Sequence, residues 1–186
     1  MFKVFFIAVS CLTIMSCNNN SPQPTVNNNP SKDSATAPEK PKDTIAGLKD
    51  LTINEAYYEQ KVKKAKKLAD STITSLSLTD IEDINRNNDA AVKIIDTLWH
   101  TDTEQIIIVA LDGETEMSAY LVHVKNNRLK QFEQVYYADV VEYFMQVNST
   151  IKDNRLSIVT TTDADGSTTK KATNFLFKDG SLQKIN

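Results

Sequence analysis

Five turn signals lie in the second half of this chain. They are Asp112-Gly113, Asn126-Asn127, Asp153-Asn154, Asp165-Gly166 and Asp179-Gly180. Asn, Asp and Gly tolerate the positive backbone φ that tight hairpin turns require. The segments between these pairs are rich in β-branched and aromatic residues, which favour strands. The pattern therefore predicts an antiparallel meander in which short turns join consecutive strands.

Eight segments are predicted as strands, namely residues 92–99, 105–111, 117–125, 129–137, 141–151, 155–162, 171–178 and 181–185. The first segment also has apolar residues at helical spacing, so a helix is the alternative there. Residues 106–109 are apolar on both faces and should form a central strand that is covered on both sides. From the last strands we expect Val159, Phe175 and Phe177 to face the core.

Two helices are predicted before the strands. Thr52 and Glu55 fit a capping box at the start of the first helix, which should end near Asp70. Its apolar stripe consists of Tyr58, Val62, Ala65 and Ala69. A second, shorter helix is expected over residues 79–86. The fold class is therefore α+β, with one or two N-terminal helices packed on a meander of about eight strands.

The strand region also shows a hint of internal repetition. A shift of 53 positions places Asp112-Gly113 on Asp165-Gly166 and Asn126-Asn127 on Asp179-Gly180. Few residues are identical, so either two four-stranded repeats or a chance similarity of two hairpin arrays explains the pattern. Eight antiparallel strands can close as a barrel or remain an open sheet.

A proline-rich segment precedes this region. All five prolines lie between Pro22 and Pro41, in a stretch that has no aromatic residue. Such a composition buries too little apolar surface to offset the entropy of ordering. We expect residues 17–47 to form a disordered tether, whose reach is roughly 30 Å for about 30 residues. Residues 48–186 should form a single α+β domain, which is large enough to bury a core.

The first residues have the pattern of a secretory signal peptide, residues 1–16. Lys3 is followed by an uncharged run over residues 4–16. This run is too short to span a bilayer as a helix, which needs about 20 apolar residues. The residues at its end are Ile14, Met15, Ser16 and Cys17. An alternative cut lies before Cys11, which follows Ala8-Val9-Ser10.

This ending resembles the lipobox of bacterial lipoprotein precursors. The resemblance implies that Cys17 becomes the mature N-terminus and carries a diacylglyceryl thioether and an N-acyl chain such as palmitate. The protein would then be anchored by lipid in the cell envelope. An acidic run after the lipidated cysteine marks surface export in some such families, and none follows Cys17. The periplasmic side of a membrane is therefore favoured, and the cell surface is the alternative. An ordinary secretory signal with an incidental cysteine is the other interpretation.

Charge and cysteine content exclude some classes of protein. Both cysteines lie at or before Cys17, so the domain contains no disulfide. Removal of residues 1–16 would take away one basic residue and change the net charge from −3 to about −4. Nucleic-acid binding requires a basic face, so no nucleic-acid partner is expected.

Catalytic motifs are missing from the sequence. It has no G-x-S-x-G, no S-x-x-K with its partner motifs and no glycine-rich phosphate loop. His100, Asp102 and Glu104 alternate in one short loop and could reach one metal ion, but such a segment is more often a simple turn. The segment 163–166 has too few ligands for a calcium loop and fits a hairpin turn. We therefore expect no enzyme, no cofactor and no metal site.

Two features could mark a binding surface. The first is a run of lysines that would contact anionic lipid or form a solvated helix face, namely Lys61, Lys63, Lys64, Lys66 and Lys67. The second is the pair of aromatic segments 135–137 and 143–145, in which Tyr136 and Phe144 are expected to be exposed. The alternative for these aromatic residues is packing within the core.

The leading functional hypothesis is a non-enzymatic, lipid-anchored envelope protein. It would act as a binding or scaffold module for a protein or glycan partner through its sheet. A periplasmic inhibitor or immunity-type lipoprotein is one alternative, because a small acidic domain on a tether fits that role. A small hydrolase is the other.

Overall fold

The computed structural model describes residues 47–186, apart from residues 87–88, 140–143, 165, 179 and 186. The chain divides into two units, Met1–Lys42 and Asp43–Asn186. The predicted signal peptide, Cys17 and all of the tether except residue 47 lie outside the described residues, as do Tyr143, Asp165 and Asp179.

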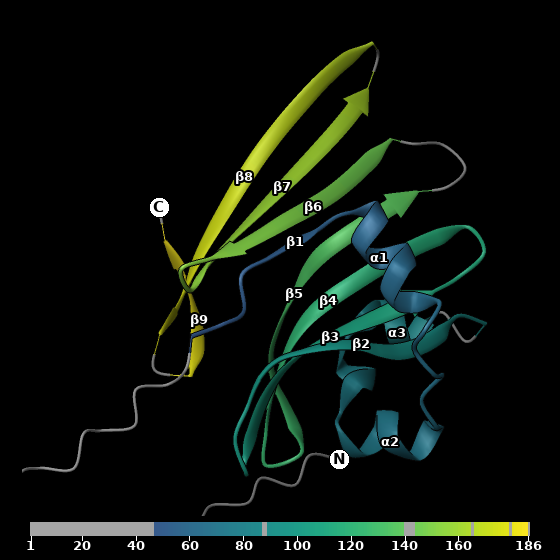
Figure 1. Cartoon of the computed structure of the whole chain (residues 1–186). Helices are drawn as coiled ribbons and strands as arrows, with labels where there is room; N and C mark the ends of the chain where they lie inside the picture. The colour runs from purple at the N-terminus through teal and green to yellow at the C-terminus, as the bar shows by residue number, and fades with distance from the viewer. Residues whose placement is uncertain (1–46, 87–88, 140–143, 165, 179, 186) are drawn as a thin grey trace, which may run out of the picture. The chain divides into compact units, whose positions relative to one another are not determined.

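The described residues form one antiparallel sheet of nine strands (Figure 1). The strands are β1 (Leu51–Ile53), β2 (Ala91–His100), β3 (Glu104–Asp112), β4 (Glu116–Lys125), β5 (Arg128–Asp139), β6 (Met145–Lys152), β7 (Arg155–Ala164), β8 (Ser167–Lys178) and β9 (Ser181–Ile185). Strands β2 to β9 neighbour one another in chain order, which confirms the antiparallel meander. Strand β1 is additional and pairs with β6. The sheet is open, so the barrel alternative is wrong.

The turns have the backbone geometry that their residues favour. Asn126, Asn127, Asp153 and Asn154 have φ values of 51°, 58°, 49° and 61°. Gly166 and Gly180 each have a φ of 73°. Each of these four turns joins two neighbouring strands, as their sequences predict.

The strand bounds follow the spacing of 53 residues. A shift by that number moves β2 from residues 91–100 to residues 144–153, and β6 occupies Met145–Lys152. The same shift moves β4 to residues 169–178, and β8 occupies Ser167–Lys178. The strands β2–β5, which we call the first half, thus correspond in order to β6–β9, the second half.

The two halves diverge from a short junction between β5 and β6. Among the described residues, these strands pair only at Tyr137 with Val147 and at Ala138 with Gln146. Beyond this junction the second half diverges from the first (Figure 1). The main core cluster draws on both halves, since it contains Leu121 of β4 and Phe175 of β8. The core therefore forms between two parts of one sheet.

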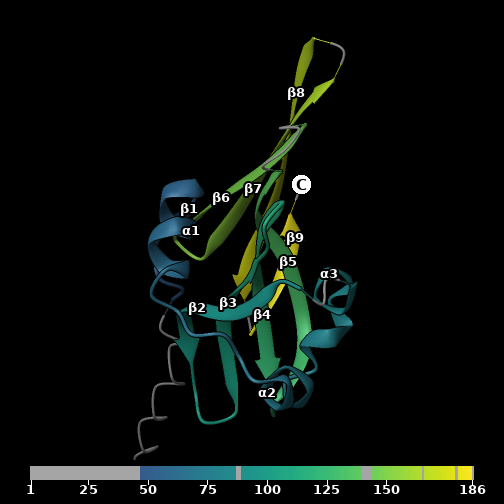
Figure 2. The same cartoon turned by 90° about the vertical axis from the view of Figure 1, so that its right-hand side faces the viewer.

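Short helices cover the other face of the first half. They are α2 (Asp70–Ser75), the 3-10 helix η1 (Leu78–Asp80) and α3 (Glu82–Arg86). Leu78 and Ile84 share a second core cluster with Val109 and Val122 of the sheet. Figure 2 shows α2 and α3 together on one side of the strands. Residues 106–109 are buried on both faces of the sheet, which confirms that prediction.

The first helix is shorter than its stripe predicts. Helix α1 spans Glu55–Val62, and its N-cap is Asn54, whose side chain accepts a hydrogen bond from the Tyr57 backbone N–H at 3.0 Å. Thr52 belongs to β1 instead. After α1 the chain runs along the edge of β2, where the Leu68 N–H donates to the Val92 carbonyl at 2.8 Å. This backbone pairing competes with the helix and ends it early.

Candidate binding surface

The second half has one face that no helix covers among the described residues. In an antiparallel pair, residues opposite each other lie on the same face. The register therefore places one row across this face, formed by Thr150, Ser157, Asn174 and Ile185. The neighbouring rows contain Asn148, Val159 and Ala172 on one side, and Lys152, Arg155, Leu176 and Gln183 on the other. We call these residues the outer face; each of them is exposed or half-buried.

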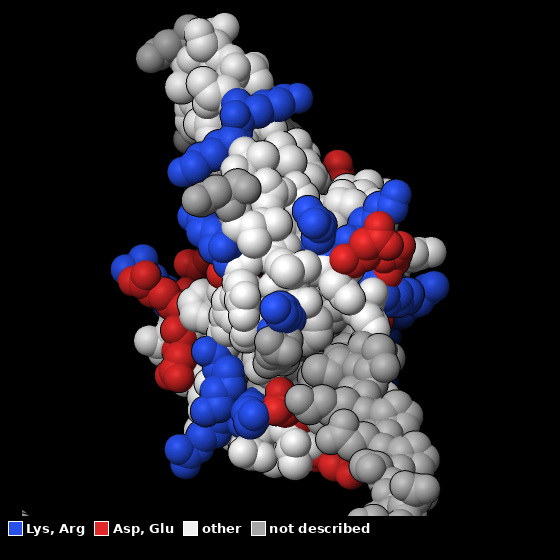
Figure 3. Space-filling view, turned by 90° about the vertical axis from the view of Figure 1, so that its left-hand side faces the viewer, with Lys and Arg blue, Asp and Glu red and all other residues white. Residues whose placement is uncertain are grey.

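The outer face combines apolar and polar side chains. Val159, Leu176 and Ile185 are half-buried and belong to neither core cluster. Amide and hydroxyl groups stand between and around these apolar side chains. The rows that define the face contain Lys152 and Arg155 but no carboxylate. Viewed from the side on which β8 and β9 lie, Lys and Arg are scattered among uncharged residues, with Asp and Glu beside some of them (Figure 3).

Val159 corrects one prediction about the core. We expected this side chain to point inward, but Leu156 and Ile158 are the buried residues of β7. Leu156 lies opposite Phe175, so the inward positions of β7 are the even-numbered ones. Phe175 and Phe177 are buried, as expected. A run of hydrophobic and Thr residues does not reveal which of its two faces is buried, and this is why the sequence failed to mark the outer face.

Tyr136 does not belong to an exposed surface. The residue is 0% exposed, and its ring stacks on that of Tyr58 at a centroid distance of 4.8 Å. Its register explains the error. Ala119 lies opposite Tyr136 but Tyr120 lies opposite Gln134, so an irregularity in β5 brings both Val135 and Tyr136 into the core. The expected pairing of Tyr136 with Phe144 as one exposed patch is therefore wrong.

Phe144 is exposed, as predicted, with 54% of its surface accessible. It lies just before β6, and its carbonyl accepts a hydrogen bond from the Asp163 N–H at 2.9 Å. Phe132 on β5 is a second large exposed apolar residue, which the sequence did not single out. Its ring packs edge-on against Tyr120 at 6.2 Å.

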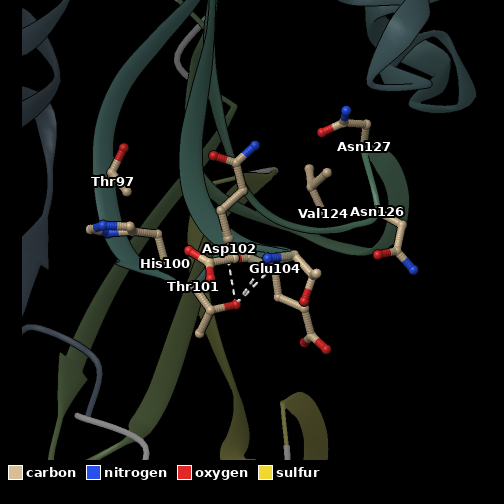
Figure 4. Close-up of a pocket in the computed structure, with 10 residues that line it drawn as sticks. Thr97, His100, Thr101, Asp102, Glu104, Val124, Asn126 and Asn127 are labelled. Atoms are coloured by element: carbon tan, nitrogen blue, oxygen red, sulfur yellow. Dashed lines mark hydrogen bonds between the residues drawn. The ribbon is translucent and has the colours of Figure 1, made fainter.

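A pocket of about 880 Å³ lies beside the loop between β2 and β3. His100 stands on one side of it, and Asn126 and Asn127 stand on the other (Figure 4). The hydroxyl of Thr101 accepts hydrogen bonds from two backbone N–H groups, that of Thr103 at 3.4 Å and that of Glu104 at 3.0 Å. The loop is therefore a hydrogen-bonded turn.

Glu104 in this pocket contacts a lysine and a histidine. Its carboxylate contacts Lys125 Nζ at 2.6 Å and His123 Nε2 at 3.2 Å. The hydrogen bond from Lys125 is the main cause that lowers the pKa of Glu104 below its usual value, against the opposing effect of burial. Among the described residues, no cluster of three or more His, Cys, Asp or Glu side chains is arranged to hold a metal ion. The geometry thus gives Glu104 a structural role.

The lysine run is not one helix face, because α1 ends at Val62. Lys61 pairs with Asp96 at 2.6 Å, and Lys63 pairs with Glu59 at 3.3 Å. Lys64, Lys66 and Lys67 are exposed. The run therefore divides into paired and solvated side chains. In the described part of the chain, no helix has the length and apolar character needed to span a membrane.

Comparison with known proteins gives no family for this fold. No protein-family model matches the chain, and we find no similar protein among curated sequences or solved structures.

Proposed function

We propose that this chain is a non-enzymatic, lipid-anchored envelope protein whose outer face binds a protein partner. One observation carries the proposal: the two halves have corresponding strands, yet helices cover only the first half among the described residues. We also infer that the halves are repeats of one four-stranded unit, and the 53-residue spacing of their strands supports this. The second half, unlike the first, then keeps a face that is open to a separate partner.

The composition of the outer face supports a protein partner. Interfaces between separable proteins combine apolar residues with many hydrogen-bonding groups and are not strongly hydrophobic overall. Val159, Leu176 and Ile185 provide the apolar residues, and Asn148, Ser157 and other polar side chains lie between and around them. A broad sheet face fits another protein better than a small ligand, because small-molecule sites are concave.

The anchor is proposed from the sequence at Cys17. Lipid at this residue and the tether after it would hold the domain near a membrane while its outer face remains accessible. Mass spectrometry of the mature protein should find an N-acylated, diacylglyceryl-modified Cys17, and Cys17→Ala should release the chain from membranes. An unmodified Cys17, or a Cys17→Ala chain that stays membrane-bound, would contradict the anchor.

Site-specific photo-crosslinking tests the binding face. A photoreactive amino acid at Ser157, in the middle of the outer face, should give one discrete adduct with a protein in intact cells. The control position is Asn85, which is exposed on α3 over the first half. Equal adducts at both positions, or none at Ser157, would overturn the assignment of the outer face. An adduct with a single toxin or hydrolase would identify the partner as an inhibited enzyme.

A further inference from the structure

Strand β8 has a long edge that lacks a neighbouring strand. It pairs with β7 from Ser167 to Leu176, but with β9 only from Asn174 onward. Among the described residues, 167–173 therefore have a strand on one side only, and we call this segment the open edge. Figures 1 and 2 both show the β7–β8 hairpin projecting beyond the neighbouring strands. Unpaired N–H and C=O groups along such an edge form a template for another strand.

The opposite end of the sheet is protected in a way that the open edge is not. Strand β2 has two register shifts against β3, and the Leu68 N–H already bonds to the Val92 carbonyl. Irregular pairing and a covering segment both block the addition of a strand. The register between β7 and β8 runs without a shift from Ala164 opposite Ser167 to Arg155 opposite Leu176. The open edge therefore keeps the regular geometry that strand pairing requires.

The position of β9 shows where an added strand would lie. Ile185 of β9 pairs with Asn174, so the next positions along the same line face Thr173 and the rest of the open edge. A strand in this position would continue the line of β9 antiparallel to β8. It would form main-chain hydrogen bonds to β8 without displacing any strand of the described domain.

The charges on the open edge favour an acidic occupant. Lys170 and Lys171 are consecutive, so their side chains project to opposite faces of the ribbon. They lie opposite Thr161 and Thr160 on β7, and neither forms an ion pair in the described part of the chain. Opposite charges on neighbouring strands stabilise their pairing.

We infer that the open edge binds an extended, acidic polypeptide segment of the partner as an additional β-strand. Recognition of this kind takes its affinity from main-chain hydrogen bonds and its selectivity from side chains. The inference rests on the proposed function, since it describes how the partner of the second half is held.

A C-terminal extension of the full chain tests this inference. The six residues Thr-Glu-Glu-Thr-Val-Thr, added after Asn186, would bring their two glutamates opposite Lys171 and Lys170 if the register of β9 continues. Covalent attachment gives the added segment a high effective concentration at the edge. The matched control is Thr-Lys-Lys-Thr-Val-Thr, which has the same length and strand propensity.

Amide hydrogen exchange of residues 168–173 is the readout. With the acidic extension, those amides in the segment that point away from β7 should exchange at least about tenfold more slowly, because they become hydrogen-bonded. The basic extension should slow them less than about threefold. In the double variant Lys170→Glu with Lys171→Glu, the basic extension should instead give the stronger protection.

No protection with either extension, or equal protection with both, would overturn the inference. This experiment uses the purified chain alone. Its failure would therefore leave the crosslinking result at Ser157 standing, and failure at Ser157 would leave the exchange result standing.

Discussion

The side-chain amide of Gln131 holds the backbone of Leu182 through two hydrogen bonds. Its Nε2 donates to the Leu182 carbonyl at 2.9 Å, and its Oε1 accepts from the Leu182 N–H at 3.1 Å. Gln131 lies in β5 and Leu182 in β9, so this contact joins the first half to the last strand of the second. The junction at Tyr137 and Ala138 connects the halves elsewhere along β5. Besides the shared core, the junction and the Gln131 contact therefore join β5 to the second half at two separate places.

Replacing Gln131 with Ala should destabilise the domain by about 1–3 kcal/mol, because it leaves the partly buried N–H and C=O of Leu182 without these partners. Urea unfolding measures the loss, and hydrogen exchange at the Leu182 amide should accelerate. The control is Gln183→Ala, at an exposed position one residue along β9 from Leu182. If both variants have the same stability, the contact does not hold the halves together.

Alanine substitutions at Gly166 and Gly180 distinguish the effect of backbone strain on stability from that of a close contact with Glu104. Gly166 and Gly180 share a φ of 73°, where an alanine costs about 1–2 kcal/mol. A Cβ at Gly180 would lie 3.2 Å from Glu104 Oε2, whereas a Cβ at Gly166 has no neighbour within 4 Å. Gly180→Ala should therefore lower the midpoint of thermal unfolding more than Gly166→Ala. A larger effect at Gly166 would contradict this packing of the β8–β9 turn against Glu104.

The stacked tyrosines of the core should differ in how the loss of their hydroxyls changes the stability of the domain. Burial, together with the nearby Glu55 and Glu59, raises the pKa of Tyr136 to about 12. Its hydroxyl is buried without a hydrogen-bond partner among the described residues. Tyr136→Phe should therefore be neutral or stabilise the domain by up to about 1 kcal/mol.

Tyr58 provides the matched comparison. Its hydroxyl donates to the Leu111 carbonyl at 3.0 Å, so Tyr58→Phe should cost about 1 kcal/mol. Chemical denaturation of both variants tests the contrast. A loss of stability at Tyr136 equal to that at Tyr58 would show that the Tyr136 hydroxyl has a partner in solution.

Asp96 should contribute an acid-sensitive part of the stability. Burial alone would raise the pKa of this carboxyl, but hydrogen bonds from Lys61 and Tyr57 and the charges of Lys61 and Lys49 outweigh burial and lower it from the ordinary 3.8. Because the folded-state pKa is the lower one, the stabilisation is complete well above pH 3.8. It disappears as the pH falls through the folded-state value.

Asp96→Asn tests this linkage. The variant should be less stable than the natural chain at about pH 6, and the difference should shrink towards about pH 3. Unfolding free energies measured across this range give the result. Asp80→Asn, at an exposed position in η1, is the control. A difference between the natural chain and Asp96→Asn that stays constant with pH would refute the ion pair as its cause.

Local sequence was sufficient to predict the turns and most strands. Asn126-Asn127 and Asp153-Asn154 adopt the positive φ that their types allow, and Ser181–Ile185 is a strand with the predicted bounds. These features depend on neighbouring residues only. The short strand β1 was read as the beginning of a helix, because its pairing partner on β6 lies about 100 residues away in the sequence.

The candidate site could not be predicted in the same way. An irregularity in β5 buries Tyr136, and periodicity cannot reveal such a shift. Val159 faces outward because Leu156 and Phe175 share the inner face, and that is decided by the pairing of two strands. Among the described residues, no helix covers the outer face and no strand pairs with the open edge. This information exists only in the folded arrangement.

Cysteine accessibility in the envelope is the most direct measurement of the central claim. Both native cysteines lie at or before Cys17, so a single cysteine can be introduced into the domain without interference. Ser157→Cys should react with a membrane-impermeant maleimide readily in the purified protein and at least about tenfold more slowly in intact envelopes, because a bound partner excludes the reagent. Asn85→Cys should react equally in both. Equal reactivity of Ser157→Cys in the two preparations would contradict a binding role for the outer face.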